Sequence, residues 1–257
     1  NHSSAASDVY KRQPEATRES GNWLTAPTPR IRELDRSELD VLDVGRLQPD
    51  SAYSQTRAGQ TPIDGACIPD FDAVNRLIAT RTGPEFRLYC ELKTHLLDDT
   101  AAHARHLADL FCTTLAASPV RARTHVVSFD WRCLEHVRAA FPDLPVAHST
   151  PPLFITDPDR DPETPLSGLR GQLRAASAAG AKWLGKHDWR NQPGQTHGEK
   201  MLAAIAAAGG QHWFAFHQDV TPDTMACATR LKLGVSAWSV NEPAAMERLA
   251  RLGVSAI

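Results

Sequence analysis

From residue 87 onward, short apolar segments typical of strands alternate with amphipathic segments typical of helices. The strand candidates are 87–93, 124–129, 144–148, 211–216, 234–240 and 254–257. Helix start signals precede apolar residues at helical spacing at Asp98 or Asp99, Asp130, Thr221-Pro222 and Asn241-Glu242-Pro243. This repeated order of strand and helix predicts an α/β fold.

Two regions depart from the alternation. The chain is polar up to about residue 67, and residues 149–197 are rich in proline and aspartate, which indicates an insertion on a loop face. No Gly-x-Gly-x-x-Gly follows any strand candidate, so a dinucleotide fold loses support. Two architectures remain, a doubly wound open sheet and a closed barrel of eight strand–helix units.

In both architectures, ligands bind at the carboxyl ends of the strands. The polar or amphipathic residues predicted at those ends are Glu91, Lys93, Ser128, His148, His217, Trp238 and Asn241. Glu91 and Lys93 are two residues apart on one strand, so their side chains are expected to face the same way. They can therefore serve one site.

Composition narrows the choice of partner. The 257 residues are 42% hydrophobic and 23% charged, which is ordinary for a soluble globular protein with one large domain. A net charge of -2 gives no reason to expect nucleic acid as a partner, and no apolar run approaches the roughly 20 residues of a membrane helix. We expect a small-molecule partner. Composition leaves the compartment, cytoplasmic or exported, and the oligomeric state open.

The two ends of the chain are unusual. Residues 1–13, which include "DVYKRQ", resemble the translated end of a sequencing adapter, and we exclude them from the fold prediction. The chain stops at Ile257, where an apolar strand pattern is beginning. We therefore expect residues 14–257 to be a partial barrel domain with its first strands missing.

Four blocks of sequence occur in an order that resembles the glycerophosphodiester phosphodiesterase family. They are "GACIPDFDAVNRLI" (65–78), "CELK" (90–93), "VVSFDWRCLEHVRAAFPDLPV" (126–146) and "VSAWSVNEPAAMERLARLGVSAI" (235–257). The polar opening, with "EATRESGNWL" and "IRELDRSELDVLDVGR", resembles the segment that follows the family's second histidine. The resemblance thus runs from about residue 15 to the end.

This resemblance implies an incomplete TIM-type barrel from a phosphoric diester hydrolase, which cleaves glycerophosphodiesters to glycerol phosphate and an alcohol with Ca²⁺ or Mg²⁺. Glu91 matches a metal-binding carboxylate, and Lys93 matches the cation beside the phosphate. Trp238 matches a tryptophan near the glycerol moiety, and Phe129 matches a position close to the site. Both aromatic residues also fit a simpler role in the core.

The resemblance has one important gap. The family begins with His-Arg-Gly, Glu-Asn-Thr, a Glu-x-Asp metal pair and a strand ending in His-Asp, and residues 1–60 reproduce none of these. The two missing histidines are the family's general acid and base. We therefore expect this chain alone to be inactive, with Glu91 as a weak single metal ligand. Two alternatives remain: a barrel that only binds its ligand, and a related barrel phospholipase.

Overall fold

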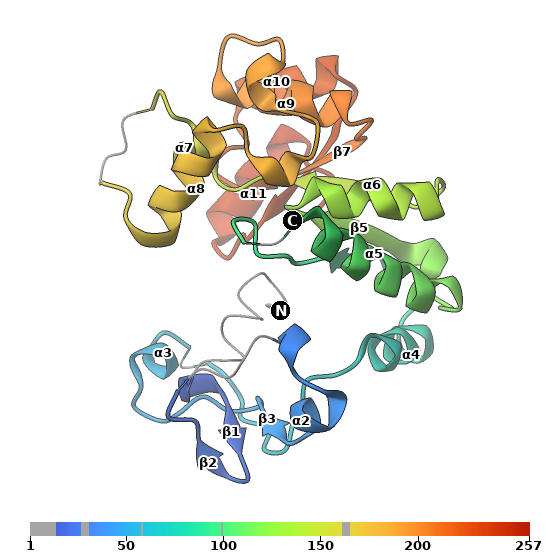
Figure 1. The fold of residues 1–257 in the computed structure, drawn as a ribbon, viewed down its shortest axis with the longest axis vertical. Coiled ribbons are helices and arrows are strands. Elements are labelled where there is room, and N and C mark those ends of the chain that lie inside the picture. The colour runs from blue at the N-terminus through green and yellow to red at the C-terminus, as the bar shows by residue number, and fades with distance from the viewer. Residues whose placement is uncertain (1–13, 27–30, 58, 99, 161–164) are drawn as a thin grey trace. The chain divides into compact units, whose positions relative to one another are not determined.

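The computed structural model describes residues 14–26, 31–57, 59–98, 100–160 and 165–257 (Figure 1). The adapter-like residues 1–13 lie outside the described part. The chain divides into two compact units, Asn1–Leu77 and Ile78–Ile257. We describe each unit by itself, and the expected single barrel domain over 14–257 stays a prediction.

The first unit contains a small antiparallel sheet with the strand order β2-β1-β3. Its elements are β1 (Arg18–Glu19), β2 (Asn22–Trp23), α2 (Arg36–Asp40), β3 (Leu42–Asp43), α3 (Ala52–Gln55) and the first part of α4 (Phe71–Arg81). The hairpin between β1 and β2 turns at Ser20 and Gly21, which both have positive φ, 49° and 83°. Two consecutive positive φ angles match the right-handed twist of the flanking strands.

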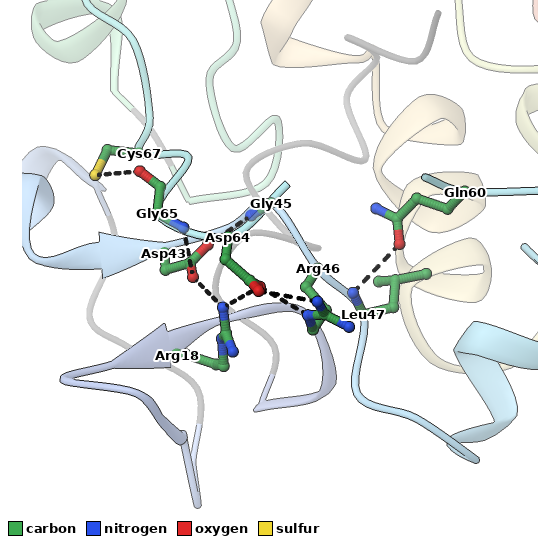
Figure 2. Close-up of polar contacts among 9 residues, drawn as sticks. All are labelled: Arg18, Asp43, Gly45, Arg46, Leu47, Gln60, Asp64, Gly65 and Cys67. Atoms are coloured by element: carbon green, nitrogen blue, oxygen red, sulfur yellow. Dashed lines mark hydrogen bonds and ion pairs between the residues drawn. The ribbon is translucent and has the colours of Figure 1, made fainter. Parts of the chain in front are cut away.

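An ion-pair cluster, formed by Arg18, Asp43, Arg46 and Asp64, ties this sheet to the following loop (Figure 2). The Asp43 carboxylate pairs with Arg18 and accepts the N–H groups of Gly45 and Gly65 at 2.9 and 3.0 Å. Hydrogen bonds from Arg46 hold the pKa of Asp64 at about 2. Each of the four charges has an opposite partner, so the cluster is a structural clasp.

The second unit is built on a parallel sheet of five strands in the order β4-β5-β6-β7-β8. The strands are β4 (Leu88–Glu91), β5 (Thr124–Ser128), β6 (Val146–Ser149), β7 (His212–Phe216) and β8 (Gly234–Trp238). The pairing register aligns Glu91 with Val127, Ser128 with His148, and Phe216 with Trp238. All five carboxyl ends therefore lie at one rim of the sheet.

Helices cover the outer face of this sheet (Figure 1). They are α5 (Ala101–Ala116), α6 (Trp131–Ala140), α9 (His197–Ala207), α10 (Pro222–Arg230) and α11 (Pro243–Leu252). Their buried faces include Phe111, Leu134, Met201 and Leu249. Between β6 and α9, the chain leaves this layer and forms α7 (Leu153–Thr156) and α8 (Gly168–Ala178), which pack on each other.

The sheet is strongly curled, because side chains from strands that are not neighbours meet across its inner face. Tyr89 of β4 stacks on Phe214 of β7 with ring centroids 6.0 Å apart. Phe129, directly after β5, meets Trp238 of β8 edge-on at 5.4 Å. Such curling is that of an incomplete (β/α)8 barrel, so the predicted fold class is confirmed.

Most predicted elements are found. The strand candidates from 87 to 240 correspond to β4–β8, with shifts of one or two residues at their ends. Candidate 254–257 forms no regular strand, but it pairs parallel to β8 through a bridge between Ser236 and Ala256 and two backbone hydrogen bonds. Thr100 caps α5 in place of Asp98, and Asp99 lies outside the described residues.

Candidate functional site

Glu91 and Lys93 lie at the carboxyl end of β4, where the sequence predicts a ligand site. Glu91 is the last residue of the strand, and Leu92 N–H still donates to the Val127 carbonyl at 2.8 Å. Tyr89 faces the inner side of the sheet, because it contacts Phe214 of β7. Side chains two residues apart share a face. Glu91 therefore faces the inner side at the rim, and Lys93 pairs with it there.

The two charges form a half-buried ion pair. The Lys93 ammonium contacts Glu91 Oε2, and the side chains are 22% and 16% exposed. Glu91 Oε1 is buried, and within the described part of the chain it receives no hydrogen bond. A buried carboxylate oxygen without a donor is costly. The pair can therefore gain free energy by accepting a further cation or donor at Oε1.

Phe129 and Trp238 lie on the same inner face. Their rings meet edge-on at 5.4 Å, and Trp238 also contacts Phe216 at 5.3 Å. Trp238 Nε1–H donates to the Phe214 carbonyl at 3.1 Å, which fixes the indole. Both residues are half-buried, so they line the inner face and are not sealed inside a core.

Sequence reasoning missed several residues that lie beside these four. Tyr89, His125, Phe214 and Phe216 share the inner face, and Tyr89 stacks on His125 at 4.8 Å. Burial lowers the pKa of His125, with help from the nearby positive charge of Arg87. Counting every second residue back from Glu91 and Phe129 would have found Tyr89 and His125.

The prediction for Ser128 and His148 is wrong, because both face the helix layer. Ser128 precedes the inward-facing Phe129, so its side chain points outward, and its hydroxyl donates to the Leu92 carbonyl at 2.7 Å. His148 is the register partner of Ser128 and packs edge-on against Trp131 of α6 at 5.1 Å. His148 is only 2% exposed. Burial, with nearby Arg138 and His187, lowers its pKa to about 3.

The other predicted polar residues are more dispersed. The His217 N–H donates to the Trp238 carbonyl at 2.9 Å, and its ring meets Phe216 at 4.7 Å, so it lies near the rim. Burial lowers its pKa, with a contribution from Arg248. A further histidine, His187, which is not among the predicted residues, pairs with Glu135 of α6 at 3.3 Å, on the helix side of the sheet.

A buried acid at the rim was also missed. Asp219 follows β7, is 8% exposed, and accepts the Leu153 N–H at the start of α7 at 2.9 Å. Burial raises its pKa to about 6, although that hydrogen bond and Arg160 oppose the shift. No local pattern marks Asp219, since the contact that buries it comes from α7, far away in the sequence.

The described residues bring together no full set of ligands for a divalent metal. Within residues 14–26, 31–57, 59–98, 100–160 and 165–257, no three His, Cys, Asp or Glu side chains come together as a metal site. Glu91 Oε1 is the one buried carboxylate oxygen without a donor among them. Ca²⁺ and Mg²⁺ need about six oxygen ligands. The described residues thus offer one ligand and not a complete site.

Taken together, the inner rim belongs to a half-barrel and carries a lysine, a carboxylate and aromatic rings. No family model and no curated protein sequence matches the chain. Solved structures, in contrast, do match the chain. A protein from Silicibacter pomeroyi DSS-3, described provisionally as a glycerophosphoryl diester phosphodiesterase, is 27% identical with a TM-score of 0.72. The match covers 95% of this chain and 71% of that one.

Two more distant structures support the fold. A glycerophosphodiester phosphodiesterase from Parabacteroides distasonis ATCC 8503 is 16% identical with a TM-score of 0.51, covering 84% of this chain and 72% of that one. A phosphodiesterase from Oleispira antarctica, in complex with its product sn-glycerol 3-phosphate, is 12% identical with a TM-score of 0.56, covering 89% and 68%. The predicted resemblance to glycerophosphodiester phosphodiesterases is therefore confirmed at the level of the fold.

One further observation concerns membranes. Among the helices of the described residues, none is both long and apolar enough to span a bilayer.

Proposed function

We propose that the second unit is part of a glycerophosphodiester phosphodiesterase barrel, and that at its rim Lys93 binds the phosphoryl group and Glu91 binds a divalent cation. The observation that supports this most is the half-buried Glu91–Lys93 ion pair on the inner face at the carboxyl end of β4. The proposal has further support from the Silicibacter pomeroyi protein, which is described provisionally as such an enzyme and matches 95% of this chain.

The chemistry of phosphodiester cleavage requires positive charge at this place. A phosphodiester carries its negative charge on non-bridging oxygens, and a preorganised ammonium stabilises the charge that develops in the transition state. In this proposal, the Lys93 ammonium binds a non-bridging oxygen. In the same proposal, Trp238 and Phe129 lie against the carbon skeleton of the substrate.

A divalent cation, Ca²⁺ or Mg²⁺, would neutralise further charge on the phosphoryl group when bound. We propose Glu91 as one of its ligands, since Oε1 is buried and receives no donor from the described residues. The described residues bring no further ligands together at this point, so we expect this chain to bind the cation weakly.

Binding of sn-glycerol 3-phosphate, measured by isothermal titration calorimetry, tests the phosphate site. A hydrogen bond to a charged group contributes about 1.5–3 kcal/mol, so Lys93→Ala should weaken binding at least tenfold. Lys186→Ala is the matched control, because Lys186 is exposed and lies in a loop. Equal affinity of Lys93→Ala and the unmodified chain would contradict the assignment.

Calcium titration tests the metal ligand separately. Glu91→Gln keeps the shape of the side chain and removes its charge, so Ca²⁺ affinity should fall about tenfold or more. Glu247→Gln is the control, since Glu247 is exposed on α11. If both variants bind Ca²⁺ like the unmodified chain, Glu91 is not a ligand.

The two general acid–base histidines have no match in this sequence, so we expect no turnover of glycerophosphocholine by this chain alone. Measurable metal-dependent hydrolysis would overturn that expectation and identify a different acid and base. Ligand binding without turnover is expected here. A barrel that only binds its ligand would behave in the same way.

A further inference from the structure

Four aromatic rings form a continuous surface at the rim, which we call the aromatic wall: Phe129, Trp238, Phe216 and Phe154. Consecutive ring centroids are 5.4, 5.3 and 6.2 Å apart. The rings come from the end of β5, from β8, from β7 and from α7. All four residues are half-buried, so part of each ring is accessible.

The wall presents carbon atoms. Phenylalanine rings carry no polar atom, and the indole N–H of Trp238 is already donated to the Phe214 carbonyl at 3.1 Å. A surface of this kind gains free energy from apolar groups, in proportion to the area removed from water. It offers no hydrogen bond to the hydroxyl groups of a sugar or of free glycerol.

Phe154 is held in place from both sides. Its helix α7 has four residues, too few to be stable alone. The Leu153 N–H donates to Asp219 at 2.9 Å, and the Thr156 hydroxyl and His197 Nε2 share a hydrogen bond of 2.9 Å. Ile155 between them is buried, with 6% exposure. A ring fixed before the ligand arrives costs little conformational entropy on binding.

We propose that the aromatic wall binds an acyl chain, so that the substrates are glycerophosphodiesters with one fatty acyl group, the lysophospholipid class. The inference rests on the proposed phosphate site at Lys93. Phe129 directly follows β5, and Lys93 lies two residues after the end of the neighbouring strand β4. A chain attached to a phosphate at Lys93 would meet Phe129 and Trp238 first and then extend along Phe216 to Phe154.

The size of the effect follows from methylene burial. Each methylene removed from water raises affinity about fourfold, and a chain lying on one side of a wall has about half of its surface covered. A chain of eight carbons should therefore increase affinity at least tenfold. The effect should increase with chain length until the chain passes Phe154.

Calorimetry with two ligands tests the proposal on the chain as it exists. The ligands are sn-glycerol 3-phosphate and 1-octanoyl-sn-glycerol 3-phosphate, below its micelle concentration. We expect the acylated ligand to bind at least tenfold more tightly. Phe154→Ala should reduce this preference without removing it, because the other three rings remain, and should change the affinity for glycerol 3-phosphate less than twofold, whereas Phe154→Leu should keep most of the preference. Phe86→Ala is the control, since Phe86 is 42% exposed and precedes β4.

The outcomes separate this inference from the proposed function. If Lys93→Ala weakens both ligands equally but the unmodified chain shows no acyl preference, the acyl inference is wrong and the phosphate site stands. If Lys93→Ala changes neither affinity, both fail. The inference is also overturned if the unmodified chain binds the octanoyl ligand no more tightly than a butanoyl ligand. So does tighter binding of glycerophosphocholine than of the octanoyl ligand, because a wall that selects a quaternary ammonium differs from one that selects a chain.

Discussion

Replacing His148 with leucine should make the protein more resistant to acid. His148 is 2% exposed, and its ring packs edge-on against Trp131 of α6. Its Nδ1 is buried and receives no hydrogen bond from the residues that the structure describes. Leucine has a similar volume and no group that titrates, so the helix layer should accept it.

The magnitude follows from the pKa of the imidazole, which burial lowers from 6.5 to about 3. At pH 4.5 the unfolded chain has bound a proton at this position, and the folded chain has not. The contribution of His148 to the free energy of unfolding is therefore fully present above pH 6.5, and it is lost as the pH falls toward 3. Two pH units at about 1.4 kcal/mol each give a loss of about 3 kcal/mol between pH 7.5 and pH 4.5.

Urea denaturation at both pH values measures this difference. The free energy of unfolding of the wild-type chain should fall by about 3 kcal/mol more than that of His148→Leu over the same interval. The matched control is His106→Leu, because His106 is exposed on α5, and this variant should keep the wild-type decline. If His148→Leu loses as much stability as the wild type, the imidazole is not held neutral by burial, and the reasoning is refuted.

Three other substitutions have defined outcomes. The Asp219 carboxyl contributes a pH dependence opposite to that of His148, because its pKa, raised to about 6, makes the wild type lose stability as the pH rises from about 4 to 6. In Asp219→Asn, urea denaturation should show that slope reduced, and an unchanged slope would count against this reasoning. Asp43→Asn leaves one N–H of the clasp without its carboxylate oxygen, so hydrogen exchange at the Gly65 amide should speed up about tenfold, whereas Asp50→Asn at an exposed turn should change nothing. Gly234→Ala should destabilise by about 1–3 kcal/mol in the same urea assay, since its methyl group would lie 2.5 Å from the His212 ring; a smaller loss would mean that the ring moves aside.

Local signals in the sequence were enough for the regular part of the second unit. Asp130, Thr221 and the Glu242-Pro243 pair mark helix starts because they satisfy free backbone N–H groups or fit the first turn, and the structure has helices at all three. The strands from 87 to 240 were predictable because apolar runs of that length, bounded by polar loops, have few other solutions.

Other parts could not be found in this way. Helix α9 was missed because Met201 to Ile205 are all buried, so the segment lacks an amphipathic period, and only the Thr196–Glu199 capping box marked its start. The outward direction of His148 depends on which alternate positions of its strand face the helices. Residues of the same kinds occur at both sets of positions, so the sequence pattern does not decide the direction. The position of Phe154 depends on contacts of α7 with Asp219 and His197, which no local pattern encodes.

The curling of the sheet has a kinetic consequence. Tyr89 meets Phe214, and Phe129 meets Trp238, so the inner face joins the first strands of the sheet to the last ones. Contacts between such distant positions require a large loss of chain entropy before they can form. We therefore expect the rim that carries Glu91 to be completed late in folding, after the helix layer. Substitutions on the inner face should mainly accelerate unfolding and leave the refolding rate almost unchanged.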